Sequence, residues 1–148
     1  MARLRLVLRL LLAAVFVFAA YMKLKESYLV FAMSIDSYQL LPEWAVLLVA
    51  RTLPWFELLL GLWLASGVGL RWAGLIASLQ LAVFFAAMFR SHLQGLGIDC
   101  GCFGTGEPLT VKTLVRDGFL TFCAILLTFL AFRASRAQVS MLTADKKL

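Results

Sequence analysis

The sequence predicts an all-α membrane protein, a four-transmembrane-helix bundle with a short interfacial helix after the first span. Of its 148 residues, 63% are hydrophobic and the mean hydropathy is +0.93. Only 15% are charged, whereas charged residues make up about a quarter of a soluble globular protein. Apolar stretches of about 20 residues, the length that crosses a bilayer, recur along the chain. A single transmembrane domain over residues 1–148 is therefore expected, with no room for a sizeable soluble domain.

The expected spans cover residues 5–24, 43–66, 72–90 and 113–132. The first follows a basic start, which also describes a signal peptide. We favour a retained span, because Lys23 and Lys25 continue the segment as an interfacial anchor. Residues 27–41 have apolar side chains at helical spacing and stop at Pro42. They predict a short helix in the interface, with a loop helix packed on the bundle as the alternative.

Two charged residues lie inside the second span. Counting from its start, Arg51 lies about 12 Å and Glu57 about 21 Å along the helix. A charge near the bilayer centre costs about 2.5–3.5 kcal/mol, so both are expected to face the bundle interior and find partners. They are about 240° apart around the helix axis and do not pair with each other, and Lys23 is the candidate partner of Glu57. A structural ion pair is one interpretation, and a cofactor-binding role for Glu57 and Arg51, facing a quinone or a proton, is the other.

The third span carries a small residue at every fourth position: Gly74, Ser78, Ala82 and Ala86. Such a stripe lets another helix approach closely in a membrane. Gln80 is an isolated polar residue of the same span, for which we expect a hydrogen bond between helices. Cys123 lies alone in the fourth apolar span and is expected to be a packed, inert residue.

The distribution of Lys and Arg predicts the orientation. One side of the expected bundle holds eight: Arg3, Arg5, Arg9, Arg71, Arg133, Arg136, Lys146 and Lys147. The other side holds five: Lys23, Lys25, Arg90, Lys112 and Arg116. The positive-inside rule makes the richer side cytoplasmic, with both termini inside and the second long loop, residues 91–112, outside. The net charge of +6 thus reports orientation in the bilayer, and nucleic-acid binding is not expected.

The loop of residues 91–112 contains Cys100 and Cys102, separated only by Gly101. A disulfide needs Cα atoms about 4.4–6.8 Å apart, which residues two apart reach only in a tight turn. Gly101 supplies the backbone freedom for such a turn. A strained disulfide is easily reduced and closes too small a loop to add much stability. The pair therefore favours thiol–disulfide exchange, with Cys100 and Cys102 as catalytic residues.

Two other interpretations of the cysteines stay open. One is a structural disulfide or two incidental thiols. The other is metal binding, but two cysteines and His92 fall short of a closed zinc set, so no metal site is predicted. Lys112 and Arg116 are the basic residues that would lower a thiol pKa; His92 lies on the same side and could act likewise, whereas Asp99 would raise it.

The segment Gly97-Ile-Asp-Cys-Gly-Cys-Phe-Gly104 resembles the motif of the methylamine-utilisation MauE membrane proteins, which are related to the DoxX group. Lys23, Ser34–Pro42 and Leu53–Leu62 agree with this resemblance. It implies a multi-pass protein of the bacterial inner membrane that assists maturation of a disulfide-rich periplasmic dehydrogenase subunit, beside a thioredoxin-like partner. The DoxX relatives imply quinone-linked chemistry.

The function expected from these observations is a membrane thiol–disulfide redox protein, a candidate thiol–disulfide oxidoreductase. Its expected partners are the lipid bilayer and an extracytoplasmic thioredoxin-like protein or client protein, with quinone as the candidate cofactor. A homo-oligomer remains open. The alternative is a non-catalytic membrane assembly factor or scaffold, in which the cysteines only shape the loop.

Overall fold

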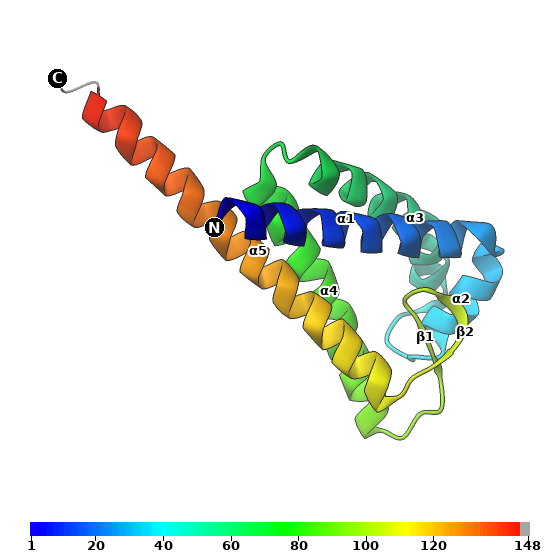
Figure 1. The fold of residues 1–148 in the computed structure, drawn as a ribbon. Coiled ribbons are helices and arrows are strands. Elements are labelled where there is room, and N and C mark those ends of the chain that lie inside the picture. Colours follow the sequence, from blue (N-terminus) through cyan, green and yellow to red (C-terminus); the bar gives the residue numbers. More distant parts are fainter. Residues whose placement is uncertain (146–148) are drawn as a thin grey trace.

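The computed structural model, which describes residues 1–145, contains two pairs of long helices that diverge from a common end (Figure 1). The elements in chain order are α1 (Ala2–Lys25), α2 (Tyr28–Asp36), α3 (Glu43–Ser66), α4 (Leu70–Leu93), β1 (Asp99–Gly101), β2 (Gly104–Pro108) and α5 (Val111–Asp145). Helix α1 packs along α3, and α4 packs along α5. The pairs meet where the chain begins and where α3 turns into α4, and they open toward α2 and the β1–β2 hairpin.

Small residues bring α4 and α5 together. A Cβ atom added at Gly74 would come within 2.8 Å of the Thr128 hydroxyl oxygen. The Ser78 and Thr128 hydroxyls also lie 3.0 Å apart, one donating to the other. The close helix approach predicted from the small-residue stripe is thus confirmed at its first two positions, whereas Ala82 and Ala86 are exposed.

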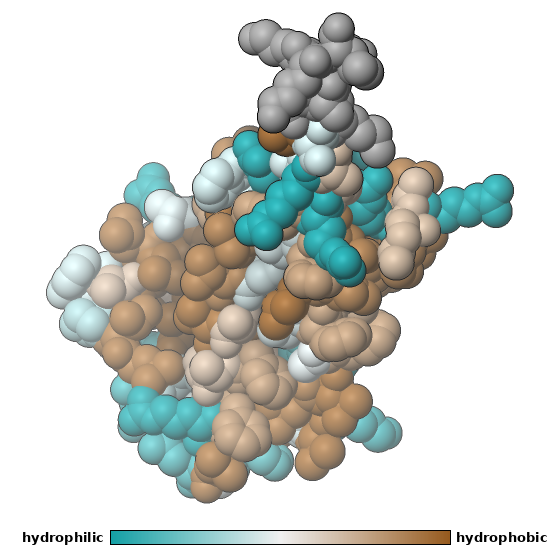
Figure 2. All heavy atoms as spheres, turned by 90° about the vertical axis from the view of Figure 1, so that its left-hand side faces the viewer, coloured by the Kyte–Doolittle hydropathy of each residue, from teal (hydrophilic) through white to brown (hydrophobic). Residues whose placement is uncertain are grey.

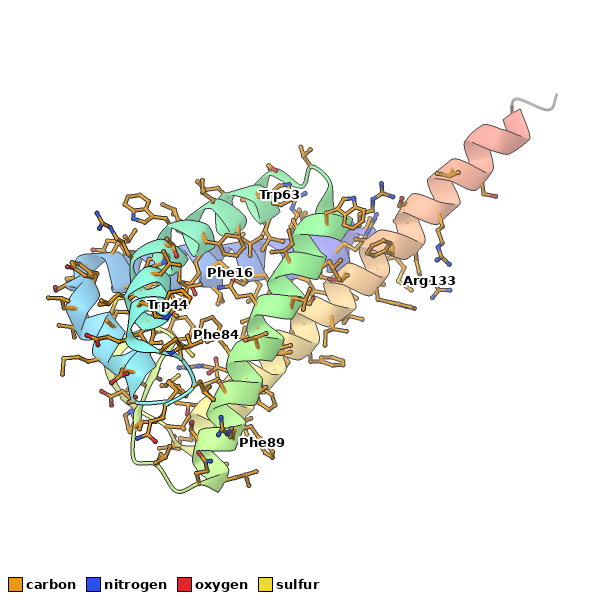
Figure 3. All side chains as sticks on the ribbon, turned by 180° about the vertical axis from the view of Figure 1, so that it is seen from behind. Phe16, Trp44, Trp63, Phe84, Phe89 and Arg133 are labelled. Carbon is orange, nitrogen blue, oxygen red and sulfur yellow. The ribbon has the colours of Figure 1, made fainter. Side chains whose placement is uncertain are left out.

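The main apolar core lies where the two pairs converge. Its buried members come from α1, α3, α4 and α5 and include Leu12, Leu64, Ala77 and Leu127. Cys123 belongs to this core, in agreement with its expected packing role. Farther toward the open end, Phe16 of α1 and Phe84 of α4 point into the space between the pairs (Figure 3). The converging end is therefore closed by packing, and the polar groups described below lie toward the diverging end.

The short helix α2 and the hairpin occupy the open end. Phe31 and Ala32 of α2 are buried against Val46 and Ala50 of α3, so α2 packs on the bundle. The strands β1 and β2 are antiparallel, and Cys102 and Phe103 form the turn between them. The hairpin contacts α2 and the C-terminal half of α1. It therefore lies beside the ends of several helices.

Among residues 1–145, four helices are long and apolar enough to cross a membrane: Ala2–Lys25, Glu43–Ser66, Leu70–Leu93 and Val111–Ala137. Their outward faces carry large apolar side chains that water would not favour. In Figure 2, apolar residues cover most of the visible face, and hydrophilic residues gather near the C-terminal part of α5 and at the lower edge. This distribution is that of a membrane protein, with polar ends and an apolar belt.

The predicted fold class is confirmed, with differences at the boundaries. Helices α1, α4 and α5 begin two or three residues before the predicted spans, α1 ends one residue and α4 three residues later, and α3 matches its predicted range of residues 43–66. Helix α5, which contains the fourth predicted span, continues to Asp145 instead of ending near residue 132, because no proline or glycine interrupts it there. The loop of residues 91–112 holds a hairpin that the sequence did not predict, and α2 ends at Asp36, five residues before the predicted end at residue 41. Lys146 and Lys147, which entered the charge count, lie outside the described residues.

Candidate functional site

The hairpin turn presents the two cysteines differently. Cys100 lies on β1 and is only 3% exposed, whereas Cys102 lies in the turn and is half-buried. Gly101 between them has φ +69°, a left-handed conformation that glycine adopts at little cost. A Cβ atom there would also lie 3.4 Å from the Ser34 Cβ atom. The sequence Cys-Gly-Cys therefore allows a tight turn that packs against α2.

Both thiols converge on one methionine of α4. The Met88 Sδ atom lies 3.4 Å from Cys100 Sγ and 3.7 Å from Cys102 Sγ. Met88 is only 1% exposed. The two cysteines are free thiols, and the Cys102 thiol donates to the Cys100 carbonyl oxygen over 3.7 Å. The hairpin and α4 together thus bring three sulfur atoms into one buried cluster.

The first turns of α5 add charges to the sulfur cluster. The Arg116 guanidinium lies 3.8 Å from Cys100 Sγ and donates to both Asp117 carboxylate oxygens at 3.3 Å. It also forms an ion pair of 2.5 Å with Glu107 of β2 and lies 4.5 Å from the centre of the Phe103 ring. Asp117 itself is buried, and its Oδ2 atom lies 3.8 Å from Cys100 Sγ. Arg116 therefore joins the hairpin, the thiols and the carboxylate.

These surroundings separate the acidities of the two thiols. The hydrogen bond with Cys102 and the nearby Arg116 charge lower the pKa of the Cys100 thiol, against the opposing effects of burial and Asp117. The pKa of the Cys102 thiol is raised, first by the interaction with Cys100 and then by burial. Burial also raises the pKa of Tyr38, whose hydroxyl donates to the Cys100 carbonyl oxygen over 2.7 Å. Cys100 is thus the more acidic thiol of the pair.

A second polar cluster joins α1, α3 and α4. The Lys23 ammonium donates to the two Glu57 oxygens at 2.7 and 2.8 Å, and both side chains are buried. The Gln80 amide donates to Glu57 at 3.2 Å. The Lys23 ammonium also lies 5.3 and 5.7 Å from the ring centres of Phe31 and Phe84. The predicted pairing of Lys23 with Glu57 is confirmed, as is the hydrogen bond of Gln80 between helices.

A small cavity connects the two clusters. It has a volume of about 30 Å³, and its walls include Lys23, Glu57, Gln80, Cys102 and Asp117. A space of about 10–15 Å³ holds one water molecule when polar partners are present. The cavity is therefore large enough for water to link the Cys102 thiol to the buried ion pair.

A larger, apolar cavity lies on the other side of Gln80. Its volume is about 500 Å³, and it is lined by α2, α3, α4 and the hairpin, with Ser34, Tyr38, Gln80 and Cys100 as polar members of its wall. Leu79 and Val83 at its edge are mostly exposed, so it opens on the apolar outer face of the bundle. The Gln80 Oε1 atom is buried without a hydrogen-bond partner among the described residues.

Three expectations about the site are wrong. Arg51 does not face the interior: its side chain is exposed, because the six positions between it and Glu57 turn it to another face of α3. Lys112 and His92 are exposed and have no described contact with the thiols. The basic residue beside the thiols is Arg116, the other residue named for this role in the sequence.

Sequence reasoning missed two members of the site. Asp117 could have been found by the signal that identified Glu57, an acidic residue within an apolar span. Met88 gave no signal, because one methionine in an apolar helix looks like ordinary packing. Only the structure, in which α4 lies beside the hairpin, shows that the Met88 sulfur contacts the thiols.

The sequence model of a family described as methylamine utilisation protein MauE matches residues 1–130. The chain belongs to the MauE family. The methylamine utilization protein MauE of Paracoccus denitrificans is 33% identical over 121 residues, which are 80% of this chain and 64% of that protein. The chain thus spans less than two thirds of that relative's length. No solved structure matches. Both polar clusters lie within the region of the chain that the MauE family model covers.

Proposed function

We propose that this MauE protein is a membrane thiol–disulfide oxidoreductase that assists disulfide formation or maturation of an extracytoplasmic client. The observation that carries the proposal is the asymmetric pair of thiols on one hairpin turn. Cys102 is half-buried at the turn, and Cys100 is buried beside Arg116. Asymmetric pairs suit exchange, because one sulfur can be attacked while the more acidic sulfur leaves.

The exchange follows from this asymmetry. In the disulfide form, a client thiolate attacks Cys102 Sγ, the Cys100–Cys102 bond breaks, and Cys100 departs as a thiolate stabilised by Arg116. A second client thiolate then attacks the client sulfur of the mixed disulfide and releases Cys102. The client gains one disulfide, and the hairpin gains two electrons and two protons as a dithiol.

Turnover needs an acceptor for those electrons and protons, either the disulfide of a thioredoxin-like partner or a quinone. A bound quinone supplies the capacity to take up two electrons and two protons. The apolar cavity fits such a group: it opens on the outer face of the bundle, and Cys100 lines its wall. Gln80 and Tyr38 lie in the wall that would face the polar ring, and the unpaired Gln80 Oε1 atom would accept a hydrogen bond from a hydroxyl of the reduced quinol form.

The proposed location follows from the charge distribution. With the termini cytoplasmic, the hairpin lies on the periplasmic side of the bacterial inner membrane, where disulfides persist. The relative from Paracoccus denitrificans is named for methylamine utilization. A disulfide-rich periplasmic dehydrogenase subunit, as in methylamine dehydrogenase maturation, is the client that this family membership favours.

The test replaces both cysteines of the hairpin by serine and compares the thiol state of extracytoplasmic proteins in the host. Cells with Cys100→Ser/Cys102→Ser should accumulate reduced client, whereas Cys123→Ala, in the core, should leave clients oxidised. Unchanged client oxidation in the double variant would contradict the proposal.

The second candidate is a non-catalytic assembly factor. The specific observation in its favour is that Ala82 and Ala86 are exposed on α4, where a partner helix could approach closely. In that case a partner should co-purify with the Cys100→Ser/Cys102→Ser variant as well as with the wild type. The larger side chain of Ala86→Leu should prevent close packing on this face of α4 and release the partner.

A further inference from the structure

We propose that the reduced hairpin binds one Cu(I) ion through the sulfur atoms of Cys100, Cys102 and Met88. This site goes beyond thiol exchange and does not depend on it. Thiol exchange requires only the two cysteines, and it leaves the buried Met88 thioether without a role.

The distances fit three ligands around one ion. Metal–sulfur bonds are about 2.3 Å long, so sulfurs that share an ion in a trigonal arrangement lie about 4 Å apart. Met88 Sδ lies 3.4 and 3.7 Å from the two thiol sulfurs. The thiols of Cys100 and Cys102 and a carboxylate oxygen of Asp117 all lie within 4.8 Å of one another. Small side-chain adjustments would place all three sulfurs at bonding distance.

The ligand types favour Cu(I). Thiolate and thioether sulfurs are soft ligands that select Cu(I), whereas zinc sites use thiolates, imidazoles and carboxylates. A zinc ion here would take Asp117 in place of Met88. Asp117 is already engaged, however, with both of its oxygens accepting hydrogen bonds from Arg116. The described partners of the Met88 sulfur are the two thiols, whose protons the ion would replace, so Met88 is the better available third ligand.

The surroundings suit a Cu(I)–thiolate complex. Binding exchanges two thiol protons for two Cu–S bonds and transfers no electron. The complex of one Cu(I) with two thiolates carries one negative charge. The Arg116 guanidinium lies 3.8 Å from Cys100 Sγ and faces this charge, and it also pairs with the Asp117 carboxylate on the same side. Cys100 and Met88 are at most 3% exposed, so the ion would be shielded from water. A Cys100–Cys102 disulfide would eliminate two of the ligands, so only the dithiol form binds.

The experiment is an anaerobic Cu(I) titration of the purified, reduced full chain in detergent, in competition with bathocuproine disulfonate. We expect one Cu(I) per chain. Cys100→Ser or Cys102→Ser should abolish binding, and Met88→Leu should weaken it at least about tenfold. Met33→Leu and Cys123→Ala are matched controls, since Met33 is exposed on α2 and Cys123 lies in the core, and both should bind like the wild type.

Three results would overturn the site: no Cu(I) retained by the wild type, equal affinity in Met88→Leu, or tighter binding of Zn(II) that Asp117→Asn abolishes. Folding of each variant is checked by its helical circular dichroism, and Met88→Leu conserves the volume of the core. The readout is metal bound to reduced protein, so it is independent of whether any client becomes oxidised.

Discussion

The two polar clusters of the molecule share one small cavity but are built in opposite ways. In the Lys23–Glu57 cluster, opposite charges are joined by hydrogen bonds of 2.7 and 2.8 Å, and both side chains are buried. In the cysteine cluster, the sulfur contacts are 3.4–3.8 Å long, and one carboxylate and one guanidinium lie beside two ionisable thiols.

This difference in contact distances indicates that the Lys23–Glu57 pair is a structural contact and that the cysteine cluster is a reactive one. The ion pair joins α1 to α3 within the span, where a single unpaired charge would be costly. The thiols are held by weak contacts on a hairpin, so they can change partners without disrupting the bundle. Each of the following substitutions tests one side of this comparison.

Breaking the ion pair should have the largest effect on stability. Lys23→Met or Glu57→Leu alone leaves a buried charge without its partner and should lower the free energy of unfolding by about 3–5 kcal/mol. The double variant Lys23→Met/Glu57→Leu should recover most of that loss, because no charge remains buried. Denaturant titration in detergent, followed by circular dichroism, measures all three.

Arg51→Gln is the control, since Arg51 lies on the same helix with an exposed side chain; its effect should stay within about 0.5 kcal/mol. Equal losses in the double variant and the single variants would show that the pair is not a simple structural contact. Measuring thiol–disulfide exchange by Cys100 and Cys102 in the double variant then shows whether the Lys23–Glu57 pair affects their reactivity across the shared cavity.

Removing the charge beside the thiols should change their acidity. The hydrogen bond with Cys102 is the first cause that lowers the pKa of the Cys100 thiol, and the Arg116 charge lowers it further, so Arg116→Gln should raise the pH midpoint of Cys100 alkylation. The measurement is alkylation rate against pH in a Cys102→Ser/Cys123→Ala background, in which Cys100 is the one thiol left. Lys112→Gln, with an exposed side chain, should leave the midpoint unchanged. An equal rise of the midpoint in both variants would show that any nearby positive charge has this effect, without a specific contact between Arg116 and Cys100.

Loosening the hairpin should have the smallest effect. Tyr38→Phe removes the hydrogen bond from its hydroxyl to the Cys100 carbonyl oxygen, 2.7 Å long, and should cost about 1 kcal/mol. Hydrogen exchange of the β1 and β2 amides should then accelerate about fivefold. Tyr28→Phe is the matched control on α2, because Tyr28 is exposed. Unchanged hairpin exchange in Tyr38→Phe would show that packing alone positions the turn.

The same comparison explains what the sequence could predict. The four spans follow from apolar stretches long enough to cross a bilayer. The Lys23–Glu57 pair and the role of Gln80 follow from a second rule, that polar groups in apolar helices must find partners. The rule failed for Arg51 because it gives no direction around the helix axis. Arg51 and Glu57 point in different directions around the axis of α3, and the packing of α1 along α3 decides which of them faces inward.

The cysteine cluster was predictable only in part. The Cys-Gly-Cys spacing identified the thiols and the need for a tight turn at Gly101. Local sequence could not show that Met88 of α4 lies beside the hairpin. It also could not show that Arg116, and not Lys112, lies next to Cys100 Sγ. Those neighbours depend on the angle between the helix pairs, which no short segment of the chain determines.

The most direct test of the central claim is thiol trapping of Cys100 and Cys102 in living cells, in a Cys123→Ala background. Intact cells are labelled with a membrane-impermeant maleimide at neutral pH and then quenched in acid, before and after reduction and with or without quinone depletion. We predict a disulfide in quinone-replete cells, a dithiol that the reagent labels from the periplasmic side after depletion, and no label from the cytoplasmic side. Two thiols that stay reduced under both conditions would contradict redox cycling at this hairpin.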